Sequence, residues 1–242
     1  MISYDLLTNM GSRGNNEDSV GMFQSGEAFC FALADGLGGH GKGEIASKLA
    51  VEQAIATFAQ EGLASRECLA NSLLNGQKAI MEMQKRDRTA SDMKTTCVLL
   101  QVGTDLIQWG HVGDSRLYYF KSRKLEARTL DHSVPQLLVA AGQLKEKHIR
   151  NHPDRNRLLR VMGIEWDEPK FQLGDPVEKE EGQAFLLCSD GFWELIDEKK
   201  MISCLKKADS PKAWLLRMEE IIQKQGRGRD MDNYSAIAVW ID

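Results

Sequence analysis

The chain has 242 residues, 42% of them hydrophobic and 27% charged, which predicts one domain over residues 1–242 with a substantial apolar core. Its 31 basic and 35 acidic side chains are well mixed and give a formal charge of −4, so nucleic acid and anionic lipid are not expected partners. The five cysteines form no CxxC pair, and no segment approaches the ~18 apolar residues of a membrane helix, so we expect a reduced, cytoplasmic monomer that is neither exported nor membrane-bound.

The first half of the chain alternates strand patterns with two long helical patterns. In chain order, we expect strands at residues 20–23 and 28–34, helices at 44–60 and 66–85, and strands at 96–102, 106–112 and 116–120. The first helix is indicated by apolar residues that share one face, among them Ala46, Ala50 and Phe58. Turn residues at Gly103-Thr104-Asp105 and Ser122-Arg123 predict successive antiparallel hairpins.

The second half begins with a helical pattern and ends with a strand. In chain order, we expect a helix from Ser133 to near Gly142, a strand at 184–188, a helix at 211–224 and a strand at 234–241. Both alternating sets of side chains in the last strand are largely apolar, which predicts an interior strand covered on both faces. Hairpins and paired helices in this order predict an α+β fold of antiparallel sheets with helices packed outside them.

Acidic residues fall at the ends of the predicted strands. Asp35, Asp114 and Asp190 each follow a strand and adjoin a glycine, Asp232 precedes the last strand, and Glu17-Asp18 precedes the first. A single Asp-Gly pair usually marks a turn, but repetition at four strand edges favours convergence on one rim. Converging carboxylates repel one another unless a cation neutralises them, and oxygen ligands without a His or Cys set favour Mg²⁺ or Mn²⁺. The glycine-rich segment after Asp35 could add the backbone carbonyl of Gly36 as a ligand.

These carboxylates alone leave more than one function open. A nuclease or nucleotide phosphatase could use the same two-metal chemistry, although aromatic residues make up only 7% of the chain and do not interleave with basic ones. A purely structural interaction protein would leave the glycine-flanked acids unexplained.

Seven short motifs resemble, in sequence and in order, the metal-dependent protein phosphatases of the PP2C type in their compact bacterial form. They are RGNNED (13–18), DGLGGHGKGEIAS (35–47), TT (95–96), GDSR (113–116), DHS (131–133), SDGFWE (189–194) and DNYS (232–235). The resemblance implies a four-layer α-β-β-α sandwich of two mainly antiparallel sheets flanked by helix pairs. It also implies hydrolysis of phosphoserine and phosphothreonine in proteins at a binuclear Mn²⁺ or Mg²⁺ centre.

The resemblance further implies a role for individual residues. Asp35 would bridge both ions, and Asp190 and Asp232 would hold the first. Glu17 and the Gly36 carbonyl would serve the second ion, partly through water. Asp18 would lie beside them as a neighbouring carboxylate or ligand, and Asp114 would support a third, weaker site. Arg13 would grip the phosphate, since its planar fork makes two charge-assisted hydrogen bonds. Eukaryotic members commonly carry a histidine, proposed as a general acid, where this chain has Leu37. His40, three residues later, is therefore a candidate catalytic or substrate-contacting residue.

Residues 133–170 match a flap beside the active site in the relatives, and this segment is rich in arginine. We expect its basic side chains to help receive phosphoprotein substrates, with a solvated basic face as the alternative. The implied partners are phosphorylated proteins and a Ser/Thr kinase of the bacterial type. A catalytically silent member of the same fold, acting as a sensor or binding module, is the rival function, although such proteins usually lose a metal carboxylate.

Overall fold

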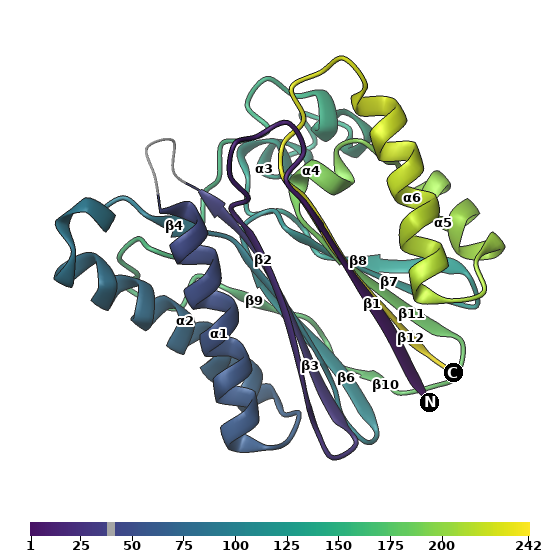
Figure 1. Ribbon diagram of the computed structural model, residues 1–242, viewed down its shortest axis with the longest axis horizontal. Helices are drawn as coiled ribbons and strands as arrows, with labels where there is room; N and C mark the ends of the chain where they lie inside the picture. The colour runs from purple at the N-terminus through teal and green to yellow at the C-terminus, as the bar shows by residue number, and fades with distance from the viewer. Residues whose placement is uncertain (38–41) are drawn as a thin grey trace.

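The computed structural model describes residues 1–37 and 42–242, and it contains two antiparallel sheets packed face to face (Figure 1). The five-stranded sheet has the order β1 (Ile2–Asn9), β12 (Tyr234–Ile241), β11 (Gln183–Cys188), β7 (Arg116–Lys121) and β8 (Lys124–Arg128). The seven-stranded sheet has the order β10 (Val177–Glu178), β6 (Leu106–Val112), β5 (Cys97–Val102), β3 (Ala28–Leu37) and β2 (Asp18–Ser25), with β4 (Lys94–Thr95) on β3 and β9 (Gln172–Leu173) on β6. Each pairing between these strands is antiparallel.

Helices cover the outer face of each sheet. Helices α1 (Gly43–Glu61) and α2 (Arg66–Arg86) pack on the seven-stranded sheet, and α5 (Glu198–Lys207) and α6 (Pro211–Gly226) pack on the five-stranded sheet (Figure 1). Shorter helical segments are α3 (Val134–Ala140), α4 (Asp190–Trp193), η1 (Arg88–Ala90) and η2 (Glu146–Asn151). The layers therefore follow the order α-β-β-α, which confirms the predicted fold class.

Strand alternation divides most of the apolar residues among three large clusters, and a fourth, small cluster contains Cys30, Phe58 and Cys68. In β11, Phe185 and Leu187 point into the layer between the sheets, whereas Leu186 and Cys188 point toward α4, α5 and α6. The outer face of β3 carries small residues, Ala32 and Ala34, which lie in one cluster with the alanines of α1. Both faces of β12 are buried, as expected of an interior strand between β1 and β11.

The predicted strands and helices all exist, but several elements were not predicted, and β1 and α5 are the longest of them. Strand β1 lies at the edge of its sheet, and most of its side chains are only partly buried, so its apolar alternation is weak. Helix α5 has only 10 residues, and four of them are lysines. In both cases the element is stabilised by packing on a neighbour rather than by a long apolar pattern of its own.

The connections that carry the acidic residues lie at one end of the two sheets. They are the β1–β2 connection, the end of β3, the β6–β7 connection, the start of α4 and the α6–β12 connection, and they meet at the upper end of the molecule in Figure 1. No helix in the described residues is long and apolar enough to cross a membrane.

Candidate active site

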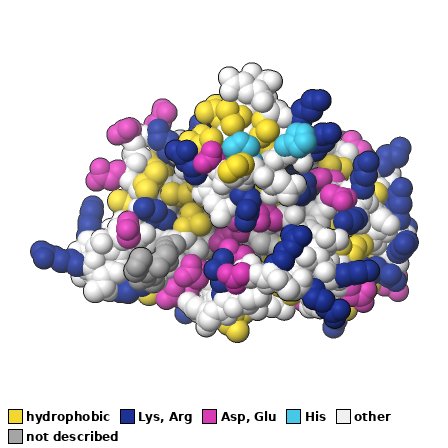
Figure 2. All heavy atoms as spheres, turned by 90° about the horizontal axis from the view of Figure 1, so that it is seen from above, with side chains coloured by type: hydrophobic (Ala, Val, Ile, Leu, Met, Phe, Trp, Pro, Cys, Tyr) yellow, Lys and Arg dark blue, Asp and Glu magenta, His cyan; other side chains and the backbone are white. Residues whose placement is uncertain are grey.

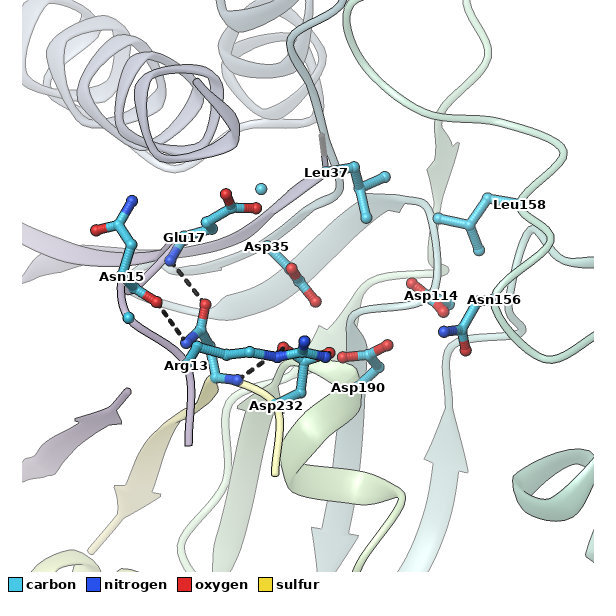
Figure 3. A pocket seen from close by; sticks show the side chains of 13 residues that line it. Arg13, Asn15, Glu17, Asp35, Leu37, Asp114, Asn156, Leu158, Asp190 and Asp232 are labelled. Carbon is cyan, nitrogen blue, oxygen red and sulfur yellow. Dashed lines mark hydrogen bonds and ion pairs between the residues drawn. The ribbon is translucent and has the colours of Figure 1, made fainter. Parts of the chain in front are cut away.

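An open pocket of about 690 Å³ lies at this end of the sandwich. Five carboxylates line it, from Glu17, Asp35, Asp114, Asp190 and Asp232, together with the guanidinium of Arg13 (Figure 3). Viewed onto this rim, acidic side chains gather near the middle of the face and basic side chains lie beside them (Figure 2). The structure thus brings together residues that are far apart in the sequence, such as Arg13 and Asp232, which are 219 positions apart.

Asp35 is positioned through its own backbone by the two threonines of the TT motif. Its N–H donates to Oγ1 of Thr96 at 3.0 Å, and its carbonyl accepts from the Thr96 N–H at 2.9 Å and from Oγ1 of Thr95 at 2.8 Å. The backbone groups of Asp35 are therefore satisfied by neighbours, and its carboxylate faces the pocket (Figure 3). Burial first, and then the charges of nearby aspartates, raise the pKa of Asp35 well above its usual range.

Asp18 lies opposite Asp35 in the β2–β3 pairing, but it is buried behind the pocket rather than lining it. Its Oδ2 accepts a hydrogen bond from the Ser189 hydroxyl at 2.8 Å, and that hydroxyl in turn accepts from the Ser235 N–H at 2.9 Å. Its Oδ1 is buried and has no hydrogen-bond partner among the described residues. Burial raises the pKa of Asp18 to about 7. This carboxylate has one oxygen available for a further partner.

The close crossing of Gly36 with Glu17 and Gly43 explains two of the glycines in the motif after Asp35. The Gly36 N–H donates to the Glu17 carbonyl at 3.0 Å. A Cβ on Gly36 would lie 2.3 Å from the Gly43 carbonyl oxygen, and one on Gly43 would lie 2.6 Å from Oε2 of Glu17. Both positions need glycine because any side chain would collide with backbone or with the Glu17 carboxylate.

Asn233 ties the loop that carries Arg13 and Glu17 to the start of β12. Its Oδ1 accepts from the Glu17 N–H at 2.8 Å, and its Nδ2 donates to the carbonyls of Met10 and Asn15, both at 2.9 Å. The side chain is buried. Asn233 belongs to the DNYS motif, but no role was predicted for it from the sequence. A polar amide next to an acidic residue at the start of an apolar strand was the available signal.

Arg13 and Asp232 form the exposed wall of the pocket. The Nε and Nη2 groups of Arg13 donate to the two carboxylate oxygens of Asp232 at 3.1 and 3.2 Å, and its Nη1 lies 3.6 Å from the Asp230 carboxylate. Asp190 begins α4 on the inner side, where burial raises its pKa. The guanidinium is a two-pronged donor at the mouth of the pocket, which is the geometry that suits a tetrahedral oxyanion.

A buried ion pair supports the loop that carries Asp114. The Asp114 carbonyl accepts from Nε1 of Trp193 at 3.0 Å. The Arg116 guanidinium carbon lies 3.5 Å from the centroid of the Trp193 ring, and Arg116 donates to both carboxylate oxygens of Asp131 at 2.7 and 2.6 Å. Burial raises the pKa of Asp114 well above its usual range. Arg116, Asp131 and Trp193 belong to the motifs GDSR, DHS and SDGFWE, but no role was predicted for them from the sequence. Their contacts hold the Asp114 carboxylate in a buried site that disfavours its charge.

The donor set fits a hard divalent cation. Burial is also the first cause that raises the pKa of Glu17, so four of the five lining carboxylates have a perturbed pKa that a cation would lower. The unpartnered Oδ1 of Asp18 points to the same need. Within residues 1–37 and 42–242, no group of three His, Cys, Asp or Glu side chains could hold an ion by itself. Water or backbone carbonyls would therefore have to complete the ligand sets.

The segment matched to the flap reaches the pocket through Asn156 and Leu158. It is joined to the rest of the molecule by a bridge between Met162 and Thr95 and by the Leu159 N–H, which donates to the His132 carbonyl at 2.7 Å. Leu158 and Leu37 give the pocket an apolar side (Figure 3).

Two arginines of this segment are already engaged in contacts, and the candidate histidine lies elsewhere. Arg150 donates to the carbonyls of Trp193 and Ile196 and to Glu198, whereas Arg155 is ion-paired with Glu194. His40 lies in residues 38–41, outside the described residues.

Comparison with known proteins gives a consistent result. The family model for protein phosphatase 2C matches residues 10–213. The chain is 30% identical over 203 residues to the serine/threonine phosphatase stp of Listeria innocua, covering 80% of this chain and 79% of that protein. The crystal structure of the serine/threonine phosphatase Stp1 from Staphylococcus aureus is similar with a TM-score of 0.88 and 27% identity, covering 100% of this chain and 96% of that one. The catalytic domain of the phosphatase PstP, solved in complex with two manganese ions, is similar with a TM-score of 0.82 and 26% identity. This match covers 100% of this chain and 99% of that one.

Proposed function

Because the chain belongs to the protein phosphatase 2C family, as a serine/threonine phosphatase of the bacterial type, we propose that it hydrolyses phosphoserine and phosphothreonine in proteins at a binuclear Mn²⁺ or Mg²⁺ centre. The observation that supports this best is the pocket in which five carboxylates surround one exposed guanidinium. We also propose that residues 1–242 act as one domain with residues 133–170 as a flap, and that the substrates include proteins phosphorylated by a bacterial Ser/Thr kinase.

The family resemblance assigns the ligands, and the residues that it names for the two ions all line the pocket. Asp35 would hold both ions. Asp190 and Asp232 would hold the first ion, and Glu17 with the Gly36 carbonyl would serve the second. Two further acids have separate roles, since Asp114 would support a third, weaker ion and Asp18 would lie behind the centre as a neighbouring carboxylate. When bound, the ions would lower the pKa of a nucleophilic water and stabilise charge on the phosphoryl oxygens.

Arg13 would position the phosphate. Its guanidinium is held by Asp232 through two hydrogen bonds at the mouth of the pocket. If Asp232 is a metal ligand, its charge is shared with the cation, and the same Nε and Nη2 donors become available to two phosphoryl oxygens. Arg13 would then orient the phosphorus for attack from the carboxylate side. Leu37 and Leu158 would exclude bulk water from the opposite wall.

Hydrolysis of a phosphothreonine peptide tests this proposal. The purified protein would be assayed with Mn²⁺, with Mg²⁺ and with chelator, alongside Asp190→Asn and the matched exposed variant Asp105→Asn. We expect metal-dependent phosphate release that is lost in Asp190→Asn and retained in Asp105→Asn. We also expect Mn²⁺ to raise the melting temperature of the wild type more than that of Asp190→Asn, because an ion that binds only the folded state stabilises it.

A folded wild type that releases no phosphate with either ion would contradict the catalytic proposal. In that case the rival function, a silent sensor or binding module, would explain the fold.

A further inference from the structure

A second pocket of about 350 Å³ adjoins the candidate active site. The two pockets share Arg13, Asn156 and Asp232, so the side chains that form the mouth of the first also form a wall of the second. Its other walls come from three segments: residues 150–155 of the flap, residues 191–195 of α4 and the turn after it, and residues 226–231 of the α6–β12 connection. We call this hollow the side pocket.

The charged side chains that line the side pocket are mainly positive when Asp232, in the wall that the two pockets share, binds a metal ion. Its lining includes four arginines, Arg13, Arg150, Arg155 and Arg229, and three carboxylates, Glu194, Asp230 and Asp232. If Asp232 holds a metal ion, as proposed above, four guanidinium groups face two carboxylates. Such a hollow disfavours a cationic occupant and favours an anionic one.

The arginines differ in how far they are already used. Arg150 is bound to two carbonyls and to Glu198, and Arg155 is paired with Glu194. Arg229, in contrast, is exposed and makes no ion pair with any residue in the described parts of the chain. It is therefore the arginine with hydrogen-bond donors to spare.

The backbone around Arg229 is fixed, which matters for a binding role. The Arg229 N–H donates to the Gly226 carbonyl at 2.9 Å, and Gly228 between them has a positive φ of 78°. Two residues later, Met231 exchanges hydrogen bonds with Ser12, because its N–H donates to the Ser12 hydroxyl at 3.2 Å and its carbonyl accepts from the Ser12 N–H at 2.9 Å. This connection is thus attached to the loop that carries Arg13.

We propose that the side pocket is a substrate subsite that accepts an anionic group, a carboxylate or a second phosphate, located close in sequence to the phosphorylated residue, with Arg229 as its main ligand. This inference rests on the proposed phosphatase function. An extended peptide advances about 3.3 Å per residue, so a residue one or two positions from the phosphorylated one reaches a hollow that shares a wall with the phosphate site. The planar guanidinium of Arg229 suits either anion.

Matched phosphopeptides test the subsite. Three peptides would differ only at the second position on each side of phosphothreonine. That position would be glutamate, glutamine or a phosphonate analogue of phosphoserine that cannot be hydrolysed, which we call the phosphoserine peptide. The fourth substrate would be p-nitrophenyl phosphate, which has no flanking residue. The variants are Arg229→Gln and its control Arg227→Gln, which alters an exposed arginine of the same connection that does not line the side pocket.

We expect the wild type to show a lower KM for the glutamate and phosphoserine peptides than for the glutamine peptide. Arg229→Gln should raise KM for the anionic peptides by about 3- to 10-fold, as expected for one partly exposed charge-assisted contact, with kcat unchanged. KM for the glutamine peptide and for p-nitrophenyl phosphate should not change, and Arg227→Gln should behave as the wild type. The ratio between the glutamate and phosphoserine peptides identifies the preferred anion.

Three outcomes would contradict the proposal. The wild type could show no preference among the peptides, Arg229→Gln could leave that preference intact, or Arg227→Gln could remove it equally, which would indicate a general surface field. In each of these cases p-nitrophenyl phosphate would still be hydrolysed, so the proposed function would stand. If none of the four substrates is hydrolysed with Mn²⁺, the proposed function itself fails.

Discussion

Replacement of Asn233 by alanine tests whether one amide holds the candidate active site together. The variant removes three hydrogen bonds, one to the Glu17 N–H and two to the carbonyls of Met10 and Asn15. Each such bond contributes about 1 kcal/mol, so we expect the free energy of unfolding to fall by about 3 kcal/mol. In a chain of this size that corresponds to a decrease of roughly 6–12 °C in the melting temperature.

The assay for this variant is urea unfolding in chelator, so that the result does not depend on a metal. Asn71→Ala is the matched control, because the Asn71 amide makes one solvent-exposed hydrogen bond, to Glu61. Asn233→Asp keeps the acceptor for Glu17 but turns a second oxygen toward the two carbonyls, so we expect it to be no more stable than Asn233→Ala. If Asn233→Ala lost less than about 1 kcal/mol, no more than the surface control, the assigned role of Asn233 would be wrong.

Three further predictions concern the groups that surround the carboxylates. Gly36→Ala places a Cβ 2.3 Å from a backbone oxygen, so urea unfolding should show that the free energy of unfolding falls by about 3 kcal/mol or more. For the control Gly14→Ala, whose Cβ would meet no atom within 4 Å, this free energy should change by no more than about 0.5 kcal/mol. Equal losses in the two variants would contradict the close-packing explanation. Folding raises the pKa of Asp18 from 3.8 to about 7, so its contribution to stability is complete below about pH 4 and lost as the pH rises through about 7. In chelator, the free energy of unfolding should therefore fall over this range, and a pH series in which Asp18→Asn showed the same slope would refute the assignment. Asp131→Ala breaks the buried ion pair with Arg116 and should lower the free energy of unfolding by about 3–5 kcal/mol. Glu180→Ala removes the exposed pair with Lys121 and should lower it by less than about 1 kcal/mol. Similar losses in denaturant titrations would show that burial of the Arg116–Asp131 pair is unimportant.

The sequence was most informative where a local pattern determines the structure. The apolar run in β11, the two apolar faces of β12 and the helical spacing in α1 were sufficient to predict buried elements, because each pattern spans only a few neighbouring residues. The positions of Asp35 and Asp190 at strand ends were visible for the same reason. The roles assigned to these carboxylates came from a family resemblance and remain predictions.

What the sequence did not reveal depends on contacts between distant residues. Asn233 bonds to Glu17 across 216 positions, and no local pattern connects the two. Arg116 and Asp131 are only 15 positions apart, yet no local pattern connects them, and their pairing is evident only in the structure, where Arg116 also lies over the Trp193 ring. The side pocket is similar, because Arg155 and Arg229 belong to segments that only the fold brings together.

The pairing of β1 with β12 has a consequence for the moment at which this enzyme becomes active during its synthesis. Among the described residues, β1 has β12 as its only sheet neighbour, in a register that runs from Ile2 opposite Ile241 to Asn9 opposite Tyr234. A nascent chain that has not yet released β12 from the ribosome therefore lacks a partner for its first strand, and Asp232 and Asn233 are not yet available to the loop that carries Glu17. Such long-range pairing is slow to form, so we expect no activity before β12 is available, and chains that stop before β12 to be inactive.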